Sequence, residues 1–478
     1  MTGARTIARN ALVVGIAQIL GKLVSLGFYV VMARMLGEEG FGAYIFALSL
    51  AQLMVVFAGF GIDEWIGRTV ARDPTTAPRM MMDALVAKTV FGTLGAVLAV
   101  VSAVVAGYSS AVQATVALLA AGALLELGMN TFNAVYQGLD DLRVPAAAAL
   151  LQRVSIGLIG IVALLAGAGI VVAAAIYFAC TLVAAIVVAT RLAAHGVKPE
   201  MPPSPAGALT LVRTTFALGL TVLLNTALFR IDTVLLSLIK DNAAVGFYGA
   251  AYRLLESPLF LAYALTGALL PSLARATRTS TPPIGELAAV GLKLILSALA
   301  PIGTVFAVLA EPIVELLFSA DYAPAIPAVR ILGGAAALYG VGYFCTFVLI
   351  GQGKQRVLPK ITAVVLVSNV ALNLVLIPVW SFRGAALVTS LSELALAVAL
   401  LTFTVRITGP LPVRRIVSGP LAGCAAIAVV TLAIGPGLLS LTVVPFVYVA
   451  VLVGAELRLY PEDFRRVLAT VRPAPVSE

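Results

Sequence analysis

Apolar stretches of about 20 residues alternate with short polar connections along almost the whole chain. A helix of about 20 apolar residues crosses the hydrocarbon core of a bilayer, so the pattern predicts a polytopic helical membrane protein. The expected fold class is an all-α integral membrane protein with about fourteen transmembrane helices. The expected spans lie near 11–34, 42–62, 84–106, 111–136, 145–167, 169–190, 210–239, 243–272, 286–310, 326–350, 358–379, 384–405, 416–435 and 439–457.

Composition leads to the same class. Hydrophobic residues make up 61% of the 478 residues and charged residues only 11%, with a mean hydropathy of +1.07. A soluble protein with that content would have too few polar residues to cover its surface. The first apolar run carries Lys22 and continues to about Met35, which is longer than the apolar region of a secretory signal. We therefore interpret it as a first transmembrane helix.

The basic residues follow a side preference. The formal net charge is +9, and most of the 31 Lys and Arg residues fall in the even-numbered connections and the two tails. The positive-inside rule then places these connections and both termini in the cytoplasm, so nucleic acid is not an expected partner. Lys88, Arg153 and Lys293 lie a turn or two into their helices and are expected to snorkel back to the interface. The basic residues expected outside are Arg34, Lys240, Arg330 and Arg383.

Similar sequences recur in the two halves of the chain. The stretch "GFGAYIFALSL" at 40–50 opens the second span and "VGFYGAAYRLL" at 245–255 opens the eighth, with Gly42 aligned on Gly246. Extra residues in the second half fall in one outer loop after the ninth span, "EPIVELLFSADYAPAIP". A repeat of six spans keeps its orientation, so we expect two six-helix lobes related by a parallel repeat, with substrate bound between them. The predicted parts are an N-terminal lobe at 1–194, a Pro-rich cytoplasmic linker at 195–208, a C-terminal lobe at 209–408, and two extra helices with a cytoplasmic tail at 409–478.

The seventh span carries two charges in "LFRIDTVLLS" at 228–237. Successive residues advance about 100° around a helix, so Arg230 and Asp232 point in nearly opposite directions and mark the two edges of a polar arc. Asn225 belongs to the same arc, while the other half of the helix is entirely apolar. We expect the polar half to face inward and the apolar half to face lipid.

Other ionisable and amide residues fall at similar depth. Lys22 lies about 18 Å of helix rise beyond Asn10, near the middle of the bilayer, and shares a stripe with Gln18. Arg253 and Glu256 in the eighth span are three residues apart and are able to pair. Charges at this depth either hold helices together or form a functional site, and the sequence leaves both readings open. The further cavity candidates are Glu126, Asn369, Asn373 and Glu393.

Over roughly its first 410 residues the chain resembles the polysaccharide-biosynthesis flippases, the O-antigen-type oligosaccharide branch of the multidrug/oligosaccharidyl-lipid/polysaccharide exporter superfamily. The resemblance is carried by "ARMLGEEGFGAY" at 33–44 and "FRIDTVLL…VGFYGAAYRLLE" at 229–256. The stretches "LLFSADYAPAIPAVRIL" at 316–332 and "GQGKQRVLPKITAVVLVSNVALNLVLIP" at 351–378 add to it.

This resemblance implies a transporter and not an enzyme. Members of the family move polyprenyl-diphosphate-linked oligosaccharide from the inner to the outer leaflet of the cytoplasmic membrane by alternating access, for surface polysaccharide such as O-antigen or exopolysaccharide. Cations in their central cavity are thought to meet the diphosphate, and Lys22, Arg230 and Arg253 are the matching positions here. The expected partners are the lipid-linked oligosaccharide and membrane lipid, with a polymerase or glycosyltransferases as further candidates.

Coupling and substrate stay open at this point. We expect no cofactor, and the candidate coupling ions are H⁺, carried by a carboxylate, and Na⁺, held by Asp232 with Asn225. A drug or metabolite exporter of the same superfamily is one alternative and predicts a cavity rich in carboxylates and aromatic residues. A lipid II flippase is another, although only Lys22 is a cation at membrane depth in the first two spans.

Overall fold

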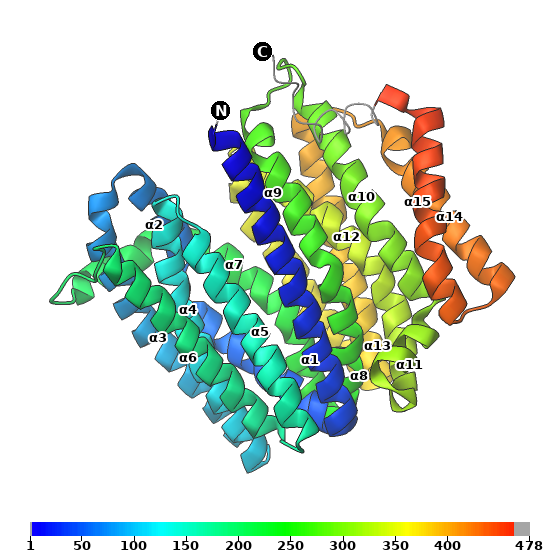
Figure 1. Ribbon diagram of the computed structural model, residues 1–478. Coiled ribbons are helices and arrows are strands. Elements are labelled where there is room, and N and C mark those ends of the chain that lie inside the picture. Colours follow the sequence, from blue (N-terminus) through cyan, green and yellow to red (C-terminus); the bar gives the residue numbers. More distant parts are fainter. Residues whose placement is uncertain (1, 463–478) are drawn as a thin grey trace. The chain divides into compact units, whose positions relative to one another are not determined.

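The protein is all-helical in the residues that the structure describes, which are 2–462; for 2–19 and 217–218 only the backbone is described. The structure is a computed structural model, and Figure 1 shows its helices in sequence colours. The helices are α1 (Thr2–Val55), α2 (Ile62–Arg72), α3 (Ala77–Val105), α4 (Ser110–Gly138), α5 (Arg143–Leu165), α6 (Ile170–Ala194), α7 (Pro205–Ile239), α8 (Asn242–Glu256), α9 (Phe260–Arg275), α10 (Ile284–Val308), α11 (Ala310–Phe318), α12 (Ile326–Gly351), α13 (Leu358–Thr408), α14 (Val413–Ile434) and α15 (Leu438–Leu459).

The number of membrane crossings agrees with the sequence pattern. In the described part of the chain, 12 helical segments are long and apolar enough to cross a membrane. Two of them are double, because α1 breaks at Gly37 (φ 67°) and α13 breaks at Ser381 (φ 50°). Both breaks fall in connections that the hydropathy pattern predicts. The predicted class, an all-α membrane protein with about fourteen crossings, is confirmed.

Local sequence explains where several helices begin. The linker ends in Ser204-Pro205, where the Ser204 hydroxyl accepts a hydrogen bond from the Gly207 amide at 3.1 Å and Pro205 occupies the first turn. A serine cap followed by proline is a strong helix start, so α7 begins within the predicted linker. Ser109 caps α4 in the same way, through the amide of Val112.

The chain forms two compact units. The first comprises residues 1–250 and 366–385, and the second comprises 251–365 and 386–478. In the first unit α1 packs on α4 and α5, and α4 packs on α3 and α6 (Figure 1). Small residues allow the close approach, because a Cβ at Gly157 would lie 2.2 Å from the Val24 side chain. The boundaries of the two predicted six-helix lobes stay a prediction.

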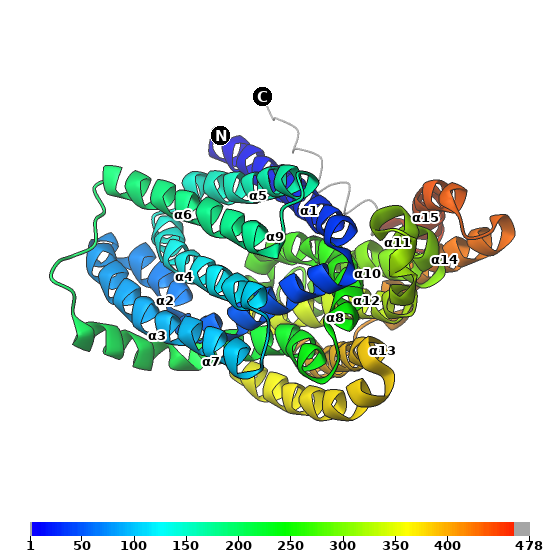
Figure 2. The ribbon, with the colours of Figure 1, turned by 90° about the horizontal axis from the view of Figure 1, so that it is seen from below.

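In the second unit α10 packs against α9, α12 and α14. The last two helices, α14 and α15, pair with each other beside α10, as Figure 2 shows from below. The expected outer loop after the ninth span is largely helical, because it contains α11. Ile313, Val314 and Phe318 of α11 are buried, which anchors this connection to the unit.

Candidate functional site

A buried carboxylate that accepts hydrogen bonds from a tyrosine and an asparagine is the most chemically distinctive feature of the first unit. Asp232 on α7 is only 2% exposed. The Tyr248 hydroxyl donates to Asp232 Oδ2 at 3.3 Å, and the Asn373 amide donates to Asp232 Oδ1 at 2.7 Å. The same Asn373 Nδ2 donates to Asn369 Oδ1 at 3.0 Å. We call Asp232, Tyr248, Asn369 and Asn373 the Asp232 cluster.

The Asp232 cluster contains three residues that were predicted separately as cavity candidates. Asn369 and Asn373 lie one turn apart on α13, so their amides occupy one face of that helix and both reach toward α7. Asn373 is fully buried, and its Oδ1 has no hydrogen-bond partner. A buried acceptor left unsatisfied is costly, so the cluster has the chemistry to receive a proton or a small oxygen-seeking cation.

The neighbouring residues of α7 agree only in part with the predicted polar and apolar halves. Asp232, Thr233 and Ser237 are all buried, and the Ser237 hydroxyl lies 2.6 Å from the Tyr108 hydroxyl. On the half expected to face lipid, however, Leu228 and Val234 are also buried. The expectation of a wholly lipid-facing half was wrong, because other segments of the first unit cover much of that half as well.

Arg253 and Glu256 form the ion pair that their spacing allows. Arg253 Nη1 lies 2.5 Å from Glu256 Oε2, and the two side chains are 11% and 18% exposed. The guanidinium charge is therefore balanced within its own helix. The role expected for Arg253 against an anion stays a prediction.

Lys22 and Arg230 are both half-buried in the first unit. Each therefore keeps part of its surface accessible. Asn225 is exposed, and the hydrogen bonds described above for the Asp232 cluster do not include it. The side chain of Gln18 lies outside the described residues.

The two remaining acidic candidates sit in different units. Glu126 on α4 is half-buried and accepts a hydrogen bond from the Tyr177 hydroxyl at 2.8 Å. Glu393 on α13 is 7% exposed and belongs to the second unit. Both are carboxylates within helical spans, as predicted, and they stay candidates for proton transfer.

Lys88 forms a buried ion pair that the sequence analysis missed. Its side chain is 1% exposed, and its ammonium lies 2.5 Å from Asp63 Oδ1 at the start of α2. It also donates to the Leu127 carbonyl and to the Thr131 hydroxyl, both at 2.9 Å. The prediction that Lys88 snorkels to the interface was wrong, because three acceptors from two helices bind its ammonium inside the unit.

Lys293, which the repeat aligns with Lys88, is also buried. It pairs with Glu456 on α15, and its ammonium lies 4.6 Å from the centre of the Tyr460 ring. Snorkelling was therefore wrong for this lysine too. One sequence feature could have predicted this burial, because the two lysines occupy equivalent positions in the repeat. Two charges at the same depth are better explained by burial with a partner than by chance.

An aromatic cluster lines one side of α12 in the second unit. Tyr339, Tyr343 and Phe347 follow one another at one-turn spacing, and Tyr263 of α9 lies across from them. The ring centres of Tyr263 and Tyr343 are 4.6 Å apart, and the hydroxyls of Tyr263 and Tyr339 are 2.8 Å apart. Tyr263 is 38% exposed, so one side of the cluster is accessible.

Comparison with known proteins identifies both a family and a fold. A model of the family described as polysaccharide biosynthesis protein matches residues 7–277, which is more than half of the chain. The inward closed conformation of the lipid II flippase MurJ superposes with a TM-score of 0.76 at 12% identity, covering 96% of this chain and 100% of that one. No curated protein matches the sequence significantly.

Other transporters share the fold as well. An inward-facing multidrug resistance transporter of the MATE family, in the MOP superfamily, superposes with a TM-score of 0.64 at 16% identity, over 81% of this chain and 94% of that one. A MOP superfamily transporter from Pyrococcus furiosus gives a TM-score of 0.58 at 19% identity, over 83% and 95%. At these identities the likeness is evidence of fold alone.

Proposed function

The chain belongs to the polysaccharide biosynthesis protein family, and from that premise we propose that it is a flippase for polyprenyl-diphosphate-linked oligosaccharide. The observation that carries the proposal is the position of Lys22 and Arg230, two half-buried cations on membrane-spanning helices of a chain with this family membership. A cation placed in a spanning helix costs about 2.5–3.5 kcal/mol on insertion scales, which makes a cation at this depth a candidate functional residue.

A diphosphate is the ligand that these cations suit. It must leave water to cross the membrane, and preplaced positive side chains offset the cost of its desolvation. Arginine presents a planar fork to phosphate oxygens, and lysine adds a compact point charge. Arg230 and Lys22 together would provide both kinds of contact.

The direction of transport also fits the charge of the cargo. In the proposed topology the protein lies in the cytoplasmic membrane with both termini in the cytoplasm. Moving an anion outward then follows an inside-negative potential, which contributes about 2.3 kcal/mol per charge per 100 mV. Polymerases and glycosyltransferases that act on the same lipid-linked sugar are the proposed protein partners.

The Asp232 cluster is our candidate for ion coupling. A buried carboxylate beside two amide side chains offers a titratable group for H⁺ and oxygen ligands for Na⁺. Because α7 carries both Arg230 and Asp232, an ion that binds Asp232 acts on the same helix as a proposed substrate cation. Ion binding and substrate binding would in this way be linked through one rigid element.

The test of the flippase proposal compares charge removal at depth with charge removal at the surface. We expect Lys22→Ala and Arg230→Ala to abolish surface polysaccharide and to accumulate lipid-linked oligosaccharide on the cytoplasmic side, at unchanged protein levels. Arg143→Ala is the matched control, because Arg143 is exposed at the start of α5. Normal surface polysaccharide in both deep variants would refute the role of these cations.

The aromatic cluster favours a second candidate function, export of a drug or metabolite. Aromatic faces attract flat or cationic substrates, and Tyr263, Tyr339 and Tyr343 present such faces near one another. Efflux of a cationic dye from cells separates the two functions. An exporter loses dye efflux in Tyr339→Leu, whereas a flippase shows no dye efflux in either the wild type or the variant.

A further inference from the structure

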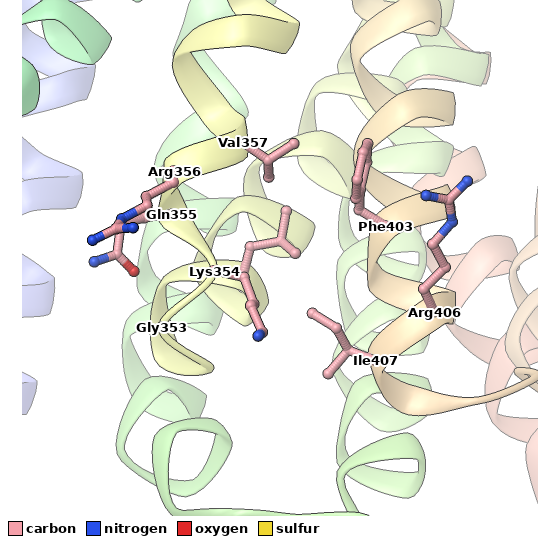
Figure 3. Close-up of a pocket in the computed structure, with 9 residues that line it drawn as sticks. Gly353, Lys354, Gln355, Arg356, Val357, Phe403, Arg406 and Ile407 are labelled. Atoms are coloured by element: carbon pink, nitrogen blue, oxygen red, sulfur yellow. The ribbon is translucent and has the colours of Figure 1, made fainter.

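A pocket of about 550 Å³ opens at one end of the second unit. Its walls are formed by the C-terminal end of α12, the loop that leads into α13, and the C-terminal end of α13 (Figure 3). Among its described lining residues, three are cations and none is a carboxylate; the cations are Lys354, Arg356 and Arg406. All three are exposed, with Lys354 between the two outward-pointing arginines (Figure 3).

The pocket is amphipathic as well as basic. Figure 3 shows the Lys354 ammonium between the loop at Gly353 and the side chain of Ile407, with Arg356 and Arg406 on opposite sides of it. The Arg406 guanidinium lies 5.0 Å from the centre of the Phe403 ring, which limits its movement. The apolar part of the lining consists of Leu349, Val357, Phe403 and Ile407.

Hydrogen bonds hold the walls of the pocket in place. Arg278 donates to the carbonyls of Arg406 and Ile407 at 2.5 and 2.6 Å, which satisfies the end of α13. The Gln352 amide donates to the Leu273 and Ala276 carbonyls, which ties the α12–α13 loop to the end of α9. The pocket is therefore preformed, and a ligand would not have to order its walls.

We propose that this pocket binds the phosphate-bearing headgroup of an anionic phospholipid of the cytoplasmic leaflet. The assignment to that leaflet rests on the topology given under the proposed function, whereas the ligand class rests on the pocket itself. Three cations spread across the mouth match the phosphate and polar groups of a headgroup, and the apolar wall matches the glycerol and upper acyl chain. A small free anion would contact Lys354 and leave the flanking guanidiniums and the apolar wall unused.

The first experiment measures lipid binding to the purified full-length protein by native mass spectrometry. Phosphatidylglycerol is titrated onto the wild type and onto a Lys354→Gln/Arg406→Gln double variant. We expect the first phosphatidylglycerol to bind about tenfold more weakly to the variant, because two of the three mouth charges are lost. Phosphatidylcholine should bind both proteins equally, and unchanged phosphatidylglycerol affinity would overturn the proposal.

A matched control removes the same charge elsewhere. Arg72 and Lys198 are exposed in the first unit, and an Arg72→Gln/Lys198→Gln variant should keep wild-type affinity for phosphatidylglycerol. Equal weakening in this control would mean that total surface charge, and not the pocket, binds the lipid. Competition by millimolar inorganic phosphate would show a free-anion site, which also overturns the assignment to lipid.

Two further readouts keep this proposal separate from the flippase proposal. The binding assay in detergent does not depend on transport, so lipid binding and loss of flippase activity are scored independently. The leaflet is tested with Lys354→Cys and a membrane-impermeant maleimide. Labelling only in inverted vesicles supports the cytoplasmic leaflet, and labelling in intact cells overturns it.

Discussion

Gly42 and Gly246, which the internal repeat aligns with each other, face each other in the structure. A Cβ on Gly42 would lie 1.8 Å from the Asn242 carbonyl and 2.7 Å from the Gly246 amide nitrogen. A Cβ on Gly246 would lie 2.1 Å from the Glu38 carbonyl. Two glycines that the sequence repeat aligns therefore lie at one close crossing of α1 and α8.

Gly246→Ala should therefore destabilise the protein. The new methyl group meets backbone, which cannot rotate away, and overpacking of this kind costs about 1–3 kcal/mol. Gly27→Ala is the control on α1, because a Cβ there has no neighbour within 4 Å. Thermal unfolding in detergent should show a lower Tm for Gly246→Ala and an unchanged or higher Tm for Gly27→Ala. Equal Tm values in both variants would contradict the close helix crossing.

The pair of Lys293 and Glu456 predicts a role for the last helix in stability. Glu456→Gln leaves a buried ammonium without its counter-charge, and breaking such a pair costs about 3–5 kcal/mol. The double variant Lys293→Met/Glu456→Gln removes both charges and should recover most of that loss. A double-mutant cycle from chemical unfolding measures the coupling, and additive effects would show that the two residues do not stabilise each other.

The ion pair of Lys88 and Asp63 predicts a similar loss of stability in the first unit. Lys88→Met removes the partner of Asp63 and also leaves the Thr131 hydroxyl without its donor. We expect a loss of stability comparable to that of Glu456→Gln, because in both cases a buried or partly buried charge loses its ion pair. Arg153→Met is the control, since Arg153 also lies within a helix but is exposed. Equal folded yield of the two variants would argue against the buried pair.

Sequence patterns predict what depends on local chemistry and miss what depends on partners far along the chain. Hydropathy predicts the crossings, and the i, i+3 spacing predicts the pair of Arg253 and Glu256. The burial of Lys88 and Lys293 depends on carboxylates contributed by other helices, which no local pattern reveals. For the same reason Asp232 was predicted with Asn225 on its own helix, whereas its amide partner is Asn373 on α13. Residues that share a face of one helix need not share a partner.

The Asp232 cluster allows the coupling ion to be identified by substitution. Asp232→Asn keeps the size of the side chain and removes its charge, so transport should lose its dependence on an imposed ion gradient while protein levels persist. Glu126→Gln is the control, because Glu126 is a carboxylate of α4 that accepts a hydrogen bond from Tyr177. Transport of lipid-linked oligosaccharide in vesicles with a defined pH or Na⁺ gradient is the measurement. An Asp232→Asn variant that still responds to the gradient would exclude this carboxylate as the carrier.

Asn373→Leu then distinguishes the two ions. A proton needs only the carboxylate, whereas Na⁺ needs several oxygen ligands, and the Asn373 amide bonds to both Asp232 and Asn369. If Na⁺ is coupled, Asn373→Leu should raise the Na⁺ concentration for half-maximal transport by about tenfold or more, the equivalent of one lost ligand contact of about 1.4 kcal/mol. If H⁺ is coupled, the same variant should keep a pH dependence of transport. Because the leucine also removes a donor from a buried carboxylate, the Tm of the variant is measured alongside, and a loss of ion response at unchanged Tm assigns the effect to the ion site.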